Sequence, residues 1–396
     1  MGAGFPRLFA ASVISNLGDG VLLGALPLLT AGLTRDPVAV SAVTAFTWLP
    51  WLLFSLPVGV VVDRVDRRRL MVAMDVVRTG LMGILAAAVL LDVLTLPLLF
   101  GLAFAMGTAE TLFDNGAQTI LPSLVPADSL ARANGRLFAA EVTANQFIGP
   151  PLGSALFVAA AAVPFGIDAA TFAVSGLLLA TLPGSYRAAT PTERKTLRHE
   201  IVDGLRWLWG HRVIRSFALG AAGLNITFTA AASLLVLFAQ DELGIGDAGF
   251  GLLLAAMAVG STAGSLLAGR VIDRLGSRSS VLVAVGVMGI ALVVIGAVRH
   301  PVAAGAMLAI VGFGQMVWNV VAVTYRQTVV PDGLLGRVNS VYRLIAYGSF
   351  PVGALAGGLI AEFAGLRSPW LFAGLGTLLL APWLARALRE LGEPSL

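Results

Sequence analysis

Runs of about 20 apolar residues recur along nearly the whole chain, and this is the length that crosses a bilayer as a helix. Only 12% of the 396 residues are charged, against about 25% in soluble globular proteins, so a soluble fold is excluded. We expect an all-α polytopic membrane protein with twelve helices, over residues 8–33, 38–62, 70–92, 95–121, 137–162, 164–183, 213–240, 248–272, 280–298, 302–325, 340–362 and 368–388.

The distribution of positive charge predicts the orientation of these helices. With both termini in the cytoplasm, most Arg and Lys residues fall in the inner loops, and the outer loops hold only Arg35, Arg299 and Arg367. This asymmetry follows the positive-inside rule. The first apolar run is too long for a cleavable signal peptide, and Asn16 and Asp19 interrupt it. We therefore expect a multi-pass protein of the cytoplasmic membrane, with both termini inside.

Composition also disfavours two other classes of protein. The basic residues lie in short loops and not in a patch with interleaved aromatics, so we expect no nucleic-acid partner. The three histidines lie outside the predicted helices without a metal or nucleophile pattern, and there is no phosphate-binding glycine loop. We expect neither an enzyme, a metal nor a cofactor. The absence of Cys leaves the redox compartment open.

The chain repeats itself in two places. "VPADSLARAN" at 125–134 matches "VPDGLLGRVN" at 330–339, and "GVVVDRVDRRRL" at 59–70 matches "GRVIDRLGSR" at 269–278. We predict two pseudosymmetric six-helix bundles, over 1–183 and 213–396. The polar stretch 184–212 between them has apolar residues at helical spacing, which indicates an amphipathic helix on the inner membrane face. The alternative is a solvated linker.

The two charged turns resemble a motif of the major facilitator superfamily, G-x-x-x-D-R-x-G-R-R, which follows the second helix and returns more weakly after the eighth. Asp66 stands in place of the motif's inner Gly, and Ser277 in place of an Arg in the repeat. The resemblance covers essentially the whole chain and implies a cytoplasmic gate in which Asp63 accepts N–H groups at the start of helix eleven. The alternative is that the arginines only set topology. The matching residues are Gly59, Asp63, Arg64, Arg67, Arg68, Gly269, Asp273, Arg274, Gly276 and Arg278.

A second stretch, "NQFIGPPLGSALF", is similar to the G-P-x-x-G-G signature of proton-coupled exporters in this superfamily. Gly149, Pro150 and Gly153 match, whereas Ser154 replaces the last Gly. Proline bends a membrane helix and glycines admit a close neighbour. Ordinary small-residue packing is the alternative, as at Gly353 in the eleventh helix.

Several carboxylates fall inside the predicted membrane helices. An ionisable group at mid-depth costs roughly 2.5–3.5 kcal/mol, so it needs a partner, a cavity or a function. Asp19 lies mid-way along the first helix, and Glu110 and Asp114 share one face of the fourth. Neighbouring carboxylates in a low dielectric should not all be ionised, which suits a proton carrier. We expect these three to couple protons, although Asp19 could instead order the bundle through a hydrogen bond.

Other polar and charged positions have lesser expected roles. Asp75 and Arg78 are three apart and should neutralise each other, and Asp168 should reach the outer interface. The resemblance implies that helices one, four, seven and ten line a central cavity. Its candidate substrate-contacting residues are Asn16, Gln118, Asn225, Gln315, Asn319, Phe113 and Trp318.

The opening "NLGDG...ALPLL" and the paired "VP...L..R.N" loops resemble the drug:proton antiporter branch, which includes macrolide-efflux and siderophore-exporter proteins. The resemblance implies export of a bulky, partly hydrophobic small molecule in exchange for H⁺, by alternating access in a monomer. Three alternatives stay open: a lysophospholipid flippase of the same fold, a solute:cation symporter, and a non-transporting membrane scaffold.

Overall fold

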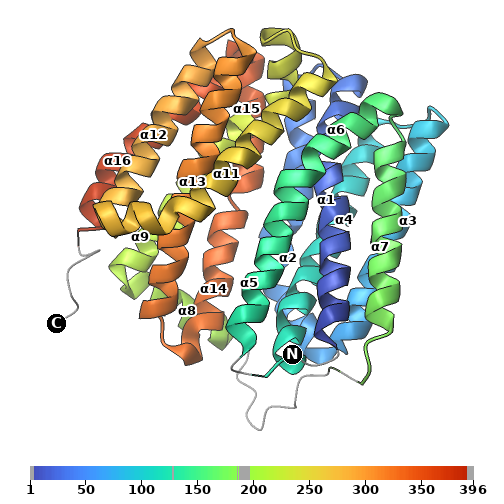
Figure 1. Ribbon diagram of the computed structural model, residues 1–396, viewed down its shortest axis with the longest axis vertical. Helices are drawn as coiled ribbons and strands as arrows, with labels where there is room; N and C mark the ends of the chain where they lie inside the picture. The colour runs from blue at the N-terminus through green and yellow to red at the C-terminus, as the bar shows by residue number, and fades with distance from the viewer. Residues whose placement is uncertain (1–3, 127–128, 185, 187–196, 390–396) are drawn as a thin grey trace. The chain divides into compact units, whose positions relative to one another are not determined.

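The structure is a computed structural model that describes residues 4–126, 129–184, 186 and 197–389 (Figure 1). Within these ranges it is helical and contains no strand. Eleven segments in the described part of the chain are long and apolar enough to cross a membrane. The remaining crossing is a helical rod made of α5 (Leu130–Glu141), a π-helical segment (Val142–Ile148) and α6 (Gly149–Ala159). The predicted all-α polytopic fold with twelve membrane helices is confirmed.

The chain divides into two compact units. The first contains residues 1–34 and 46–194, and the second contains residues 35–45 and 195–396. The other helices of the first unit are α1 (Phe5–Leu33), most of α2 (Pro37–Arg64), α3 (Arg67–Leu90), α4 (Leu96–Ile120) and α7 (Val163–Ala180). The second unit contains α8 (Leu197–Gly210), α9 (Arg212–Ala232), the short α10 (Leu235–Leu237), α11 (Asp247–Leu275), α12 (Ser277–Ala297), α13 (Pro301–Val329), α14 (Asp332–Tyr347), α15 (Phe350–Ala364) and α16 (Ser368–Ala387).

The same helix pairs pack together in each unit. In the first unit α1 packs against α6 and α7, and α3 against α4 and α7. In the second unit α9 packs against α15 and α16, and α12 against α13 and α16. Buried positions also coincide, since Met71, Asp75, Arg78 and Met82 on α3 correspond to Val281, Val285, Met288 and Leu292 on α12, each 210 residues later. The pseudosymmetry of the two bundles therefore extends to individual buried side chains.

Glycine brings the broken helix of each unit onto its first helix. A Cβ on Gly153 of α6 would overlap the carbonyl oxygen of Val21 on α1, and a Cβ on Gly357 of α15 would overlap that of Ala230 on α9. Both α6 and α15 carry a proline in their first turn, where the missing N–H costs no hydrogen bond. Gly153 of the exporter-like stretch therefore has the same packing role as its counterpart in the second unit.

The helix α8 lies in the predicted linker and is amphipathic. Leu208 is buried against a cluster from α9 and α14, and Asp203 forms an ion pair of 3.6 Å with Arg337 of α14. Val202, Leu205 and Trp209 are exposed. A helix with one face packed on the protein and an exposed apolar face is suited to a membrane surface.

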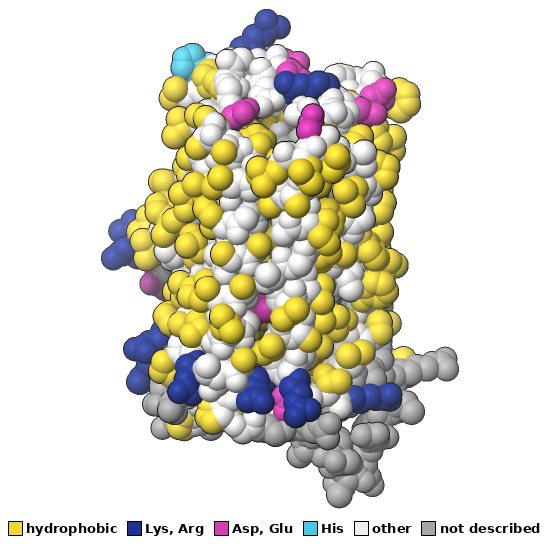
Figure 2. Space-filling view, turned by 90° about the vertical axis from the view of Figure 1, so that its right-hand side faces the viewer, with side chains coloured by type: hydrophobic (Ala, Val, Ile, Leu, Met, Phe, Trp, Pro, Cys, Tyr) yellow, Lys and Arg dark blue, Asp and Glu magenta, His cyan; other side chains and the backbone are white. Residues whose placement is uncertain are grey.

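The membrane helices extend beyond the apolar runs that predicted them. The fifth predicted helix, 137–162, starts at Leu130, and the tenth, 302–325, continues to Val329. Apolar composition marks contact with lipid, whereas a helix continues into polar residues at the membrane surface. Figure 2 shows this on one face of the molecule, where Arg side chains gather near one end of an apolar band.

Candidate functional site

The first charged turn is organised around Asp66. Its backbone is extended, and its carboxylate accepts the N–H of Arg69 at 3.0 Å and the N–H of Tyr186 at 2.9 Å, so it caps α3. In the second charged turn Gly276 occupies the loop between α11 and α12 with φ of 75°, a conformation that favours glycine. This explains why Asp66 can replace the inner Gly of the motif. The backbone at position 66 does not have a positive φ, so glycine is not needed, and the Asp side chain caps α3.

Removing this cap should destabilise the protein measurably. We expect Asp66→Ala to lower the free energy of unfolding by about 1–2 kcal/mol, because two backbone N–H groups lose their acceptor. Scanning fluorimetry in detergent would measure the fall in melting temperature. Asp273→Ala, at an exposed carboxylate of the second turn, is the control and should change the stability by less than about 0.5 kcal/mol. Equal melting temperatures for the two variants would contradict the capping role.

Three arginines of the gate motif bind the C-terminal ends of helices within their own unit. Arg67 donates to the carbonyl oxygen of Thr119 at the end of α4 at 2.8 Å, and Arg68 donates to that of Leu182 just after α7. Arg278 donates to Ala385 near the end of α16 at 2.9 Å. A guanidinium there satisfies terminal carbonyls and opposes the helix dipole. Of the other motif residues, Arg64, Gly269, Asp273 and Arg274 are exposed, while the surroundings of Gly59 and the side chain of Asp63 lie outside the described residues.

A buried ion pair lies in the core of the first unit. Asp75 and Arg78 on α3 are paired, and their side chains are 0% and 1% exposed. The guanidinium carbon of Arg78 lies 4.0 Å from the ring centre of Phe113 on α4 and 4.2 Å from that of Phe172 on α7. This geometry combines a desolvated charge pair with two cation–π contacts. Arg78 is therefore held by three helices, which is more than the expected pairing of two neighbours on one helix.

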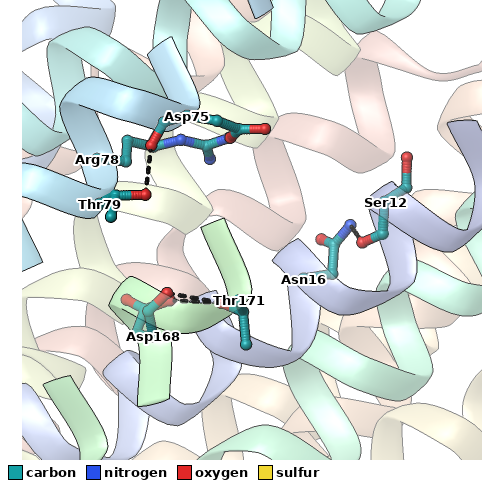
Figure 3. Close-up of polar contacts among 7 residues, drawn as sticks. All are labelled: Ser12, Asn16, Asp75, Arg78, Thr79, Asp168 and Thr171. Atoms are coloured by element: carbon teal, nitrogen blue, oxygen red, sulfur yellow. Dashed lines mark hydrogen bonds and ion pairs between the residues drawn. The ribbon is translucent and has the colours of Figure 1, made fainter. Parts of the chain in front are cut away.

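Asp168 lies in the same core and not at the interface, which corrects the expectation from sequence. The side chain is 0% exposed, and Thr171 Oγ1 lies 3.3 Å from its Oδ1 (Figure 3). A Cβ on Gly18 of α1 would overlap both Thr171 Oγ1 and Asp168 Oδ1. Gly18 therefore lets α7 bring Asp168 against α1, beside Asp19. An isolated Asp near the end of an apolar run gave no hint of this contact.

The structure brings Asp19, Glu110 and Asp114 together. All three are half-buried, and the charges of Asp19 and Glu110 interact with each other, with Asp114 and with Arg78. Asp168 also interacts with Asp19, Glu110 and Arg78. We call Asp19, Asp75, Arg78, Glu110, Asp114 and Asp168 the charge cluster. Among the described residues, Arg78 is the one cation that interacts with all of Asp19, Glu110 and Asp168.

The second unit places uncharged residues at the corresponding positions. Equivalent positions in α4 and α13 differ by 205 in residue number, since their buried residues then coincide. The difference is 210 for α3 and α12. It is 205 for α7 and α16, where buried Phe165 matches buried Trp370. The difference is 209 for α1 and α9, because Gly153 contacts Val21 of α1 and its counterpart Gly357 contacts Ala230 of α9. Asp19, Asp75, Arg78, Glu110, Asp114 and Asp168 thus correspond to Phe228, Val285, Met288, Gln315, Asn319 and Ala373. The same packing forms without these charges, so the fold does not require them.

The remaining candidate cavity residues have varied surroundings. Asn16 donates to the carbonyl of Ser12 on its own helix at 2.7 Å (Figure 3). Asn225 donates to the carbonyl of Ala346 at 2.8 Å. Phe113 and Trp318 are buried, the latter with its ring centre 5.5 Å from that of Phe217. Of the three other candidates, Gln118 on α4 is exposed, whereas Gln315 and Asn319 on α13 are half-buried.

An apolar groove of about 700 Å³ lies between α1 and the part of the rod formed by α5 and the π-helical segment. Its lining on α1 consists of Phe5, Phe9, Val13 and Leu17, and Arg136 is part of the facing wall. These four residues of α1 are each four positions apart in the sequence, which places their side chains on one face of the helix. This spacing is the sequence pattern that could have indicated the groove. Within the described residues no group of three or more His, Cys, Asp or Glu side chains could hold a metal ion.

Comparison with known proteins agrees with this architecture. A family model described as transmembrane secretion effector, of the major facilitator type, matches residues 3–393. The multidrug efflux pump Tap of Mycobacterium tuberculosis is 30% identical over 399 residues, covering 94% of this chain and 90% of Tap. The enterobactin exporter EntS of Shigella boydii is 26% identical over 396 residues, covering 98% of this chain and 92% of EntS.

A solved structure of a bacterial homolog to the human lysosomal transporter Spinster has the same fold, with a TM-score of 0.77 at 13% identity, over 99% of this chain and 98% of that one. The fold and the family model define a multi-pass membrane transporter of the major facilitator superfamily. Within that superfamily, the chain belongs to the transmembrane secretion effector family.

Proposed function

We propose that this protein is a proton-coupled exporter of a bulky, partly hydrophobic small molecule, such as a drug, an antibiotic or a siderophore. The observation that carries the proposal is the charge cluster, in which five carboxylates interact around one guanidinium inside a membrane bundle. Five ionised carboxylates beside one cation would be very unfavourable in a low dielectric, so some of them must hold protons. Groups that gain and lose protons at membrane depth are what an antiporter needs.

Export of a partly hydrophobic compound rests on two further supports. The groove along α1 is mostly apolar and includes one guanidinium, which matches a substrate with a large apolar body and a polar group. The relatives that align over nearly the whole chain are a multidrug efflux pump and a siderophore exporter. A drug-like or siderophore-like substrate therefore has more support than a nutrient.

The orientation and the gate belong to the same proposal. Both termini lie in the cytoplasm, since the Arg residues of the loops on that side outnumber those of the opposite loops, and Arg side chains gather near one end of the apolar band. The two charged turns then lie on the cytoplasmic side, where Asp63 and Asp273 latch the two halves during alternating access. The protein works as a monomer in the cytoplasmic membrane, with H⁺ as the coupling ion and without a cofactor.

A substrate panel tests the class of compound. A strain without the gene and a strain that overproduces the protein would be challenged with macrolides, other antibiotics, catecholate siderophores and lysolipids. We expect lower intracellular accumulation and higher resistance for at least one antibiotic or siderophore in the overproducing strain. Protection against lysolipids alone would instead indicate the flippase alternative. No difference for any compound would count against export.

Replacing Asp19 tests proton coupling. We expect Asp19→Asn to leave the protein folded but to abolish substrate movement driven by an imposed pH gradient in liposomes, because an amide does not exchange a proton. The transported compound would be the best member of the panel. Glu110→Gln and Asp114→Asn are companion variants that introduce the residues of the second unit, Gln315 and Asn319.

The control for these variants is Glu362→Gln on α15, which removes an exposed carboxylate of the second unit that is not a member of the charge cluster. It should retain pH-driven transport. If Asp19→Asn is as strongly coupled to the gradient as the unchanged protein, Asp19 is not part of the coupling mechanism. If all three cluster variants remain coupled, the proposed proton pathway is wrong.

A further inference from the structure

Asp168 has the surroundings of a proton-binding group, although its sequence position did not indicate one. It is fully buried on α7, and its Oδ2 has no hydrogen-bond partner among the described residues. The nearby hydroxyl of Thr171 also lies 2.7 Å from the backbone carbonyl of Asp168, so its single proton is shared between two acceptors. An ionised carboxylate left so poorly solvated is costly, whereas a neutral carboxylic acid is tolerated.

The charged groups that act on Asp168 come from three helices of the first unit. Asp19 acts on it from α1, Arg78 from α3 and Glu110 from α4. Asp75 on α3 is paired with Arg78. Among the helices that pack on α7, α6 has no titratable residue between Gly149 and Ala159. Two acidic groups, Asp19 and Glu110, therefore act on Asp168 together with one cation, Arg78.

That cation is held in place by the ion pair and the two rings. Arg78 binds Asp75 and lies between Phe113 and Phe172, while its Nε is buried without a partner among the described residues. Phe172 is one helical turn from Asp168 on the same helix. Arg78 therefore presents a fixed positive charge near the carboxylate, with one donor still available.

We propose that Asp168 is a proton-binding residue of the charge cluster and that Arg78, positioned by Asp75 and the two rings, is its fixed counter-ion. This inference rests on the proposed proton-coupled export and extends it from Asp19, Glu110 and Asp114 to α7. The second unit supports it, because Ala373 is just as buried at the corresponding position without any carboxylate. The fold does not need an acid there.

Infrared difference spectroscopy tests the proposal without any substrate, using the proton itself as the probe. The purified full-length protein in lipid nanodiscs would be stepped across pH while the carbonyl stretching band of protonated carboxylic acids is followed. We expect the unchanged protein to lose this band in more than one step as the pH rises. Asp168→Asn should remove one component, and the control Glu362→Gln, which removes an exposed carboxylate of the second unit, should retain that component.

A second variant keeps the test decisive if Asp168→Asn does not fold. Thr171→Val removes the hydroxyl beside Asp168 while preserving its size, and should shift the frequency of the same component. Spectra of Asp168→Asn and Thr171→Val that match those of the unchanged protein would overturn the proposal. If Asp168→Asn is not monodisperse, the Thr171→Val variant decides the test, and an unshifted band in its spectrum overturns the proposal. Loss of the component together with transport that ignores the pH gradient would support the proton site and reject proton-coupled export.

Discussion

Arg78→Met should be among the most destabilising single substitutions in the first unit. It leaves Asp75 buried without its partner and removes the cation that interacts with Asp19, Glu110 and Asp168. Removing one member of a buried ion pair costs about 3–5 kcal/mol, and the two cation–π contacts are lost as well. We expect a large fall in melting temperature in detergent and a reduced yield of monodisperse protein.

The second unit provides the control for this experiment. Asp75→Val combined with Arg78→Met copies Val285 and Met288, which are buried at the corresponding positions of α12. Removing both charges should recover much of the stability that the single variant loses, since well-packed apolar residues can replace a buried pair. A double variant that is less stable than Arg78→Met would show that Asp75 and Arg78 do not stabilise each other. A single variant as stable as the unchanged protein would contradict the buried pair itself.

Gly153→Leu should be nearly as damaging, for a steric reason. Any Cβ at this position would overlap the carbonyl oxygen of Val21, and neither backbone can move without separating α6 from α1. Overpacking typically costs about 1–3 kcal/mol, and we expect the upper end of that range here because the overlap is with backbone atoms. We expect a lower melting temperature and little protein in the membrane fraction.

The control for this variant is Gly101→Leu on α4, an exposed glycine with open space around the position of its Cβ. It should be produced at the level of the unchanged protein, because no atom within 4 Å opposes the added Cβ. If Gly153→Leu is produced and melts like Gly101→Leu, the close approach of α1 and α6 is not needed for folding.

The sequence by itself determined the fold class, the family and most of the helix positions. Length and apolarity of a run fix whether it can cross a bilayer, because every backbone polar group there must be satisfied within a helix. The spacing of Glu110 and Asp114 also predicted that they share a helix face. The charged turns and the repeat offsets indicated two related halves before any contact was known.

Only the tertiary structure decided which charges belong together. Asp168 was expected at the interface because its place in the run is near a helix end, but Gly18 on another helix lets it pack beside Asp19. Arg78 was expected to neutralise Asp75 alone, yet Phe113 and Phe172 from two other helices complete its surroundings. Periodicity reports which residues share a face of one helix, whereas burial and charge balance depend on the neighbouring helices, and those contacts join residues far apart in the chain.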